Sequence, residues 1–159
     1  MNVFFDSGKE IRVQAVSAKR GVAMERDPNL LGNFKIEDAI AAMYKSLTAE
    51  HLVKALTTIR ERMQEGGHLV VAVKPGSEQG LELRTVATPD GQNWFAAFTC
   101  MEEEIKKKQE YVSGFTAEIE KLLTLTLNSE EVVGIIVNPW EKPLKLTKEH
   151  IRLIMGGQA

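Results

Sequence analysis

The stretch Gly134-Ile-Ile-Val-Asn-Pro-Trp-Glu-Lys-Pro-Leu-Lys-Leu-Thr147 decides the fold, because it combines a buried strand, a forced turn, a second strand and the start of a helix. Its first glycine permits a close backbone approach, and Pro139 removes the donor that the next ladder bond needs. Asn138 can bond the backbone of its own turn. Trp140 is expected to pack back as a lid, with a hydrogen-bond partner for its indole N–H. We therefore interpret Asn-Pro-Trp as a structural turn that ends the strand.

Length and composition bound the class of protein. The chain has 159 residues, of which 43% are hydrophobic and 26% charged, as in a single soluble globular domain. The net charge of -2, with both signs mixed along the chain, argues against nucleic acid and membrane surfaces as partners. The single cysteine, Cys100, excludes an internal disulfide and fits a reducing compartment. No apolar run approaches a membrane span, and the N-terminus does not resemble a signal peptide, so we expect a cytoplasmic protein.

The first 33 residues are expected to form an N-terminal extension that contains a hairpin. Val3–Phe5 is apolar, residues 6–9 have turn chemistry, and apolar residues alternate over Ile11–Ala15. An isolated hairpin is marginally stable in water, so this one should lie either on the chain's own core or on a neighbouring subunit. The second possibility suggests a homodimer formed through the hairpin.

Two helices and three strands are predicted next. Apolar residues recur at helical spacing over Ile36–Met43, and a second helix begins at the capping residue Thr48 and ends at Gly66-Gly67. The strands are expected at Leu69–Val73, Leu81–Val86 and Trp94–Phe98. Short links between them favour an antiparallel meander.

The chain then returns to helices. Thr99-Cys-Met-Glu102 matches a capping box, and three glutamates precede three lysines at i, i+4. Another helix is expected over Phe115–Leu123 with Thr116 as its cap, followed by a buried strand at Val132–Val137. This order predicts an α+β two-layer sandwich: a mainly antiparallel sheet of about 4–6 strands with helices packed on one face. The extension (residues 1–33) and this domain (residues 34–159) are expected to form one globular unit.

Three motifs carry a family resemblance. Trp94-Phe-Ala-Ala-Phe-Thr99 is a strand that runs into a threonine, Gly134-Ile-Ile-Val-Asn-Pro-Trp140 is a strand that ends in Asn-Pro-Trp, and Leu144-Lys-Leu-Thr147 opens the last helix. In order and spacing, from about Thr48 to Met155, the chain resembles the N-terminal domain family of SseB, the enhanced serine sensitivity protein. The resemblance implies a bacterial, cytoplasmic α+β domain with no established enzymatic activity and no catalytic residues to carry over.

No catalytic or cofactor-binding motif is recognised. The sequence has no dinucleotide fingerprint, P-loop or nucleophile elbow. His51, His68 and His150 lack metal-binding spacing, so we expect no metal and no cofactor. Cys100 falls at the start of a predicted helix, where the helix dipole can lower a thiol pKa. We interpret it instead as a small residue that seals the strand–helix junction, and we expect no enzymatic activity.

The candidate binding residues are aromatic and polar side chains near two strand ends. Alternation puts Trp94, Ala96 and Phe98 on one face of their strand and Phe95 and Ala97 on the other. The helices should cover one face, and a partly open opposite face is the expected binding surface. The candidates are Trp94, Phe98, Thr99, Asn138 and Trp140.

The leading hypothesis is a non-catalytic module that binds a protein partner or acts in regulation. A first alternative is a binder of a small amino-acid-like metabolite, or an enzyme, with a site near Cys100 and Asn138. A second alternative is an immunity-type inhibitor protein, suggested by small size without catalytic chemistry. The sequence leaves these three alternatives open.

Overall fold

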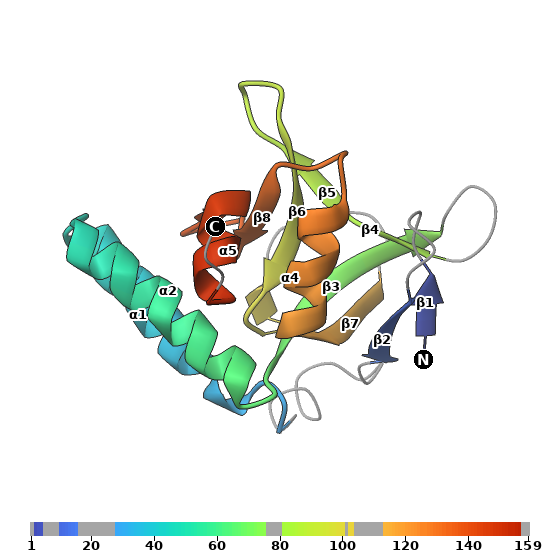
Figure 1. Cartoon of the computed structure of the whole chain (residues 1–159), viewed down its shortest axis with the longest axis horizontal. Helices are drawn as coiled ribbons and strands as arrows, with labels where there is room; N and C mark the ends of the chain where they lie inside the picture. The colour runs from blue at the N-terminus through green and yellow to red at the C-terminus, as the bar shows by residue number, and fades with distance from the viewer. Residues whose placement is uncertain are drawn as a thin grey trace.

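The computed structural model describes residues 2–4, 10–15, 28–75, 81–100, 102–103 and 113–156. Figure 1 shows the arrangement of their helices and strands. In chain order these elements are β1 (Asn2–Phe4), β2 (Glu10–Ala15), the 3-10 helix η2 (Leu31–Asn33), α1 (Phe34–Lys45), α2 (Ala49–Gln64), β3 (His68–Pro75), β4 (Leu81–Leu83), β5 (Thr85–Ala87), β6 (Asn93–Phe98), β7 (Ser113–Glu118), α4 (Ile119–Asn128), β8 (Gly134–Val137), β9 (Leu144–Thr147) and α5 (Lys148–Ile154).

One mixed sheet runs through the described residues. Its main row has the order β1-β2-β7-β3-β6-β8-β9, while β4 pairs with β3 and β5 pairs with β6. The β6–β8 pair is parallel, and the other pairs are antiparallel. The α+β class and the mainly antiparallel sheet are confirmed, and the sheet has more strands than the sequence predicted.

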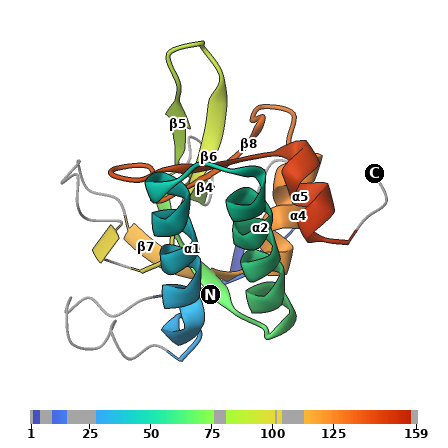
Figure 2. The same cartoon turned by 90° about the vertical axis from the view of Figure 1, so that its left-hand side faces the viewer.

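Alternate side chains of the central strands form two separate apolar layers. Val71 of β3 and Phe95 of β6 belong to the larger core, together with apolar residues of α1, α2, α4 and α5. Val70 and Phe98 point to the other side of the sheet, where Leu30 packs against them. Among the described helices, α2 contacts α1, α4 and α5, and Figure 2 shows this group from the side on which α1 and α2 lie. The predicted packing of helices on one face is therefore confirmed.

The N-terminal hairpin joins the sheet of its own chain. β1 pairs with β2, and β2 pairs in turn with β7, with Val13 opposite Ala117. The hairpin therefore needs no second subunit to lie on a sheet. The homodimer stays a prediction.

The helix boundaries follow the predicted capping chemistry. The Thr48 hydroxyl accepts a hydrogen bond from the His51 backbone N–H at the start of α2, and Gly66 follows the end of this helix with φ of 80°. At the start of α5, Thr147 and His150 form a reciprocal capping box. None of the described helices is long and apolar enough to cross a bilayer.

The predicted strand over residues 81–86 is two strands. At Arg84, the backbone N–H donates to the Ala72 carbonyl of β3 at 2.8 Å, while the Arg84 carbonyl accepts from Ala96 of β6 at 3.2 Å. The chain therefore changes partner at this residue, and β4 and β5 pair with different neighbours. The predicted antiparallel meander was therefore wrong. In a meander the middle strand would separate the first from the third, but β3 and β6 pair with each other directly.

The predicted helix over residues 115–123 was wrong at its start. Residues 113–118 form β7, which lies between β2 and β3, and α4 begins only at Ile119. Phe115, Ala117 and Ile119 all contribute to the same core. The spacing of four between Phe115 and Ile119 suits both a helical face and one face of a strand. Thr116 is consequently a strand residue and caps no helix.

Gly134 begins β8 in a space that admits no side chain. A Cβ at this position would lie 2.0 Å from the Leu146 carbonyl oxygen of β9 and 2.9 Å from a ring carbon of Trp94. The predicted close approach is confirmed, and it lets β9 pair with β8 directly beside the Trp94 ring.

We predict that Gly134→Ala lowers the free energy of unfolding by about 3 kcal/mol or more, because the clashing atom belongs to the backbone and cannot rotate away. Gly66→Ala is the matched control. No atom lies within 4 Å of a Cβ there, and only the positive φ opposes the change, which costs about 1–2 kcal/mol. Urea unfolding measures both variants, and equal losses would contradict the steric explanation.

Candidate functional site

The parallel pairing of β6 and β8 brings two polar residues together. Thr99 directly follows β6 and Asn138 directly follows β8. Because parallel strands end at the same edge of a sheet, the two residues become neighbours. The Thr99 N–H donates to Asn138 Oδ1 at 3.0 Å, and Asn138 Nδ2 donates to Thr99 Oγ1 at 3.0 Å. Both residues were predicted site candidates, and the structure places them in direct contact.

The Asn138 backbone has a positive φ of 53°. Asparagine adopts this left-handed conformation more readily than most residues with a side chain. The Asn138 N–H also donates to the Ala97 carbonyl at 2.8 Å, which continues the β6–β8 pairing by one residue. The side chain is therefore fixed at both its amide atoms and its backbone.

Helix α1 joins this pair through Glu37. The Thr99 hydroxyl donates to Glu37 Oε2 at 2.6 Å. The predicted capping box of Thr99 with Glu102 was wrong: the Thr99 N–H donates to Asn138 Oδ1, and among the described residues the Thr99 hydroxyl bonds Glu37 and Asn138. Glu102 and Glu103 are helical, and the rest of the predicted helix lies outside the described residues.

Asn33 and Arg62 extend the polar network behind the site. Asn33 Nδ2 donates to the backbone carbonyls of His68 and Thr99 at 2.8 and 3.0 Å. Arg62 Nε donates to Asn33 Oδ1 at 2.9 Å. Arg62 also pairs with Glu65 at 2.8 Å, and this hydrogen bond lowers the pKa of the Glu65 carboxyl.

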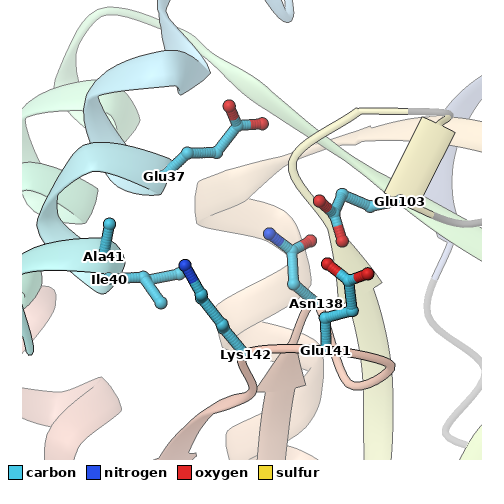
Figure 3. A pocket seen from close by; sticks show the side chains of 7 residues that line it. All are labelled: Glu37, Ile40, Ala41, Glu103, Asn138, Glu141 and Lys142. Carbon is cyan, nitrogen blue, oxygen red and sulfur yellow. The ribbon is translucent and has the colours of Figure 1, made fainter. Parts of the chain in front are cut away.

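A pocket of about 160 Å³ lies beside the Thr99–Asn138 pair, between α1 and the turn after β8. In Figure 3, Lys142 extends from that turn toward α1, and the side chains of Glu103 and Glu141 lie together on the opposite side. Lys142 makes no ion pair with a described residue. The pocket is lined by Glu37, Ile40, Ala41, Glu103, Asn138, Glu141 and Lys142.

The sequence missed most of this lining. Asn138 was a candidate, but Glu37 was hidden on the polar side of a predicted helix, and Glu103 belonged to the run of three glutamates that precedes three lysines. Lys142 and Glu141 follow Trp140 in a turn, where charged residues carry no signal of their own. Their convergence depends on α1 lying beside this turn.

The aromatic candidates lie outside this lining. Phe98 is 1% exposed and Trp94 is 4% exposed, so the expected open sheet face is buried at both positions. Trp140 is half-buried, with its ring 5.9 Å from the Phe98 ring and beneath the Arg84 guanidinium at 5.5 Å. Trp140 thus packs back as predicted, and the strand that it packs against is β6. A ligand role for these three aromatic residues stays a prediction.

Cys100 has a raised thiol pKa, and His51 and His150 make contacts at helix ends. Burial is the main factor that raises the pKa of the Cys100 thiol, to about 12, and the nearby Glu37 and Glu102 add to it. His150 caps α5, and the His51 ring contacts the Ser46 carbonyl. No group of three potential metal ligands occurs within the part of the chain that the structure describes.

The fold and the site define an α+β domain with a polar pocket at the shared end of two parallel strands. A comparison with protein families matches residues 34–153 to the SseB protein N-terminal domain. The chain therefore belongs to the SseB N-terminal domain family, as its three sequence motifs indicated. Comparisons with curated proteins and with solved structures gave no match.

We predict that Cys100 in the folded protein reacts with iodoacetamide at pH 8 at least about tenfold more slowly than in the urea-unfolded chain, where a thiol pKa of about 8.5 applies. The folded pKa lies above the unfolded one. The contribution of this thiol to stability is therefore complete below about pH 8.5 and falls as the pH rises toward 12. Mass spectrometry of alkylated protein measures the rates, and similar rates in both states would show that the folded thiol ionises readily.

Proposed function

We propose that this SseB-family domain is a non-catalytic binding module of the bacterial cytoplasm, and that its binding site is the pocket between α1 and the turn after β8. The observation that carries the proposal is the position of the pocket. It lies where the parallel strands β6 and β8 both end, and in open α/β sheets ligands bind outside the carboxyl ends of the parallel strands.

Binding is favoured over catalysis by the state of the two potential nucleophiles. The Thr99 side chain is 0% exposed and its hydroxyl already donates to Glu37, so a substrate has no access to it. The raised pKa of Cys100 keeps this thiol protonated at neutral pH, and a protonated thiol is a poor nucleophile. These residues therefore support a site that holds a ligand without transforming it.

The lining favours a small ligand that carries both charges, as an amino acid does. Lys142 supplies a cation for a carboxylate. Thr99 bonds one Glu37 oxygen, and a carboxylate has further acceptor capacity for a ligand ammonium group. The cavity of about 160 Å³ is smaller than the roughly 300–1,000 Å³ of pockets for drug-sized ligands. An amino-acid-like molecule is therefore the ligand class that we propose.

We predict that at least one amino acid from a panel that includes serine raises the melting temperature, because a ligand at a hundredfold excess over its Kd stabilises the fold by about 2.7 kcal/mol. Differential scanning fluorimetry measures the shift. Lys142→Met and Glu37→Gln should reduce it, because each removes one charge and nearly keeps the length of the side chain.

Glu61→Gln is the matched control, since Glu61 is exposed on α2 and does not line the pocket. Simple amines and simple carboxylates, which present only one of the two charges, should shift the melting temperature less than the amino acid. A panel that gives no shift at millimolar concentration would remove the amino-acid proposal.

A protein partner is the second candidate, supported by exposed apolar side chains at the tip of the α1–α2 hairpin. Tyr44 is 51% exposed, Leu47 is 77% exposed and Val53 is 59% exposed. The Tyr44 hydroxyl donates to the Pro143 carbonyl at 2.7 Å, which ties this tip to the turn that carries Lys142. Exposed apolar patches of this kind often mark protein interaction sites.

If this tip binds a protein, Leu47→Ser and Val53→Ser should release a stoichiometric partner that the parent chain retains in affinity purification. The parent melting temperature should be kept, because both side chains face solvent. Thr57→Ser, at an exposed position of α2, is the control. A partner retained equally by all variants would place the contact elsewhere, and a light-scattering mass of two chains would instead support the homodimer.

A further inference from the structure

We propose that Arg62 and Asn33 are positioning residues for the pocket. They fix Thr99 from behind, and Thr99 fixes the pocket residues Glu37 and Asn138. This inference builds on the proposed function, because it assigns a supporting layer to the same site.

Arg62 is a buried cation that ties the segment before α1 to α2. Its side chain is only 8% exposed. Its three nitrogen atoms have separate acceptors: Nε bonds Asn33 Oδ1 at 2.9 Å, Nη2 bonds the Asn29 carbonyl at 2.9 Å, and Nη1 bonds Glu65 at 2.8 Å. A planar guanidinium presents its donors in a fixed fork, so these contacts also fix the direction of the Asn33 side chain.

Two glycines leave room for this guanidinium. A Cβ added at Gly32 would lie 2.9 Å from one terminal nitrogen of Arg62, and a Cβ added at Gly67 would lie 2.5 Å from the other. The backbones on both sides therefore approach the guanidinium more closely than side chains would permit. The position of Arg62 is consequently set by packing as well as by hydrogen bonds.

Asn33 transmits this position to the strand end. Asn33 is 1% exposed, and its oxygen is engaged by Arg62, so its amide nitrogen is directed to the carbonyls of His68 and Thr99. An exchange of the amide oxygen and nitrogen would place a donor against Arg62 and an acceptor against two carbonyls. The network therefore has one favourable orientation.

Thr99 is the last member before the pocket. Its carbonyl bonds Asn33, its N–H bonds Asn138 Oδ1, and its hydroxyl accepts from Asn138 and donates to Glu37. The polar groups of Thr99 thus link Asn33, which lies behind the site, to Asn138 and Glu37, which line the pocket. A shift of Asn33 consequently alters two of the groups that a ligand would meet.

The experiment is NMR of the side-chain amide groups in the full chain, with Asn33→Asp as the main variant. This substitution keeps an acceptor for Arg62 but removes both donors to the His68 and Thr99 carbonyls. We expect the Asn138 side-chain amide signals to shift and their exchange with solvent to become about tenfold faster. The exposed Asn93 amide is the internal reference and should not change.

Arg62→Lys is measured alongside, because it keeps the charge and removes the fork, and it should move the Asn138 signals in the same direction to a smaller extent. Arg60→Lys, at an exposed position of the same helix, is the control and should leave them unchanged. A purely structural role of Arg62 would lower the melting temperature while leaving the Asn138 signals of the folded protein in place, and that result would overturn the proposal.

If Asn33→Asp does not fold, Arg62→Lys decides in the same way: shifted Asn138 signals support the positioning role, and unchanged signals refute it. The measurement needs no ligand. A negative amino-acid screen therefore leaves this inference standing, and unchanged Asn138 signals leave the proposed ligand class standing.

Discussion

The paired hydrogen bonds between Thr99 and Asn138 are the interaction on which the site depends. They form because β6 and β8 are parallel, so that both strands end at one edge. An antiparallel pair would have put the two residues at opposite edges. The positive φ of Asn138 turns the chain away at this point, and the turn then carries Lys142 to the pocket.

The same pair has a stabilising role, because it closes the buried end of two central strands. Thr99 and Asn138 are 0% and 6% exposed, and a buried polar group that lacks a partner costs about 1–3 kcal/mol. Asn33 and Arg62 satisfy the remaining groups on the inner side. One hydrogen-bond network thus stabilises the fold and forms part of the candidate site. Its inner residues, Asn33 and Arg62, bond other protein groups, and its outer residues, Glu37 and Asn138, line the pocket.

Local sequence patterns predicted the elements well where a single interpretation was available. Thr48 and Thr147 cap helices as expected, and Gly134 begins a strand with a close backbone approach. The pattern failed where two periods coincide: residues four apart lie on one face in both a helix and a strand, so β7 was mistaken for the start of α4. At Thr99, the hydroxyl had a local capping partner in the sequence, but Glu37 and Asn138 compete for it in the folded protein.

The sequence by itself determined the class of the fold, the turn at Asn138 and the family, because these depend on periodicity, backbone chemistry and motifs that are local along the chain. The tertiary structure decided the pocket. Glu37 lies 62 residues from Thr99, and Asn138 lies 39 residues from it. Contacts over such distances depend on strand order and on the direction of pairing, which no local pattern encodes. The residues that line a binding site therefore became visible only when the parallel strand ends and α1 were placed side by side.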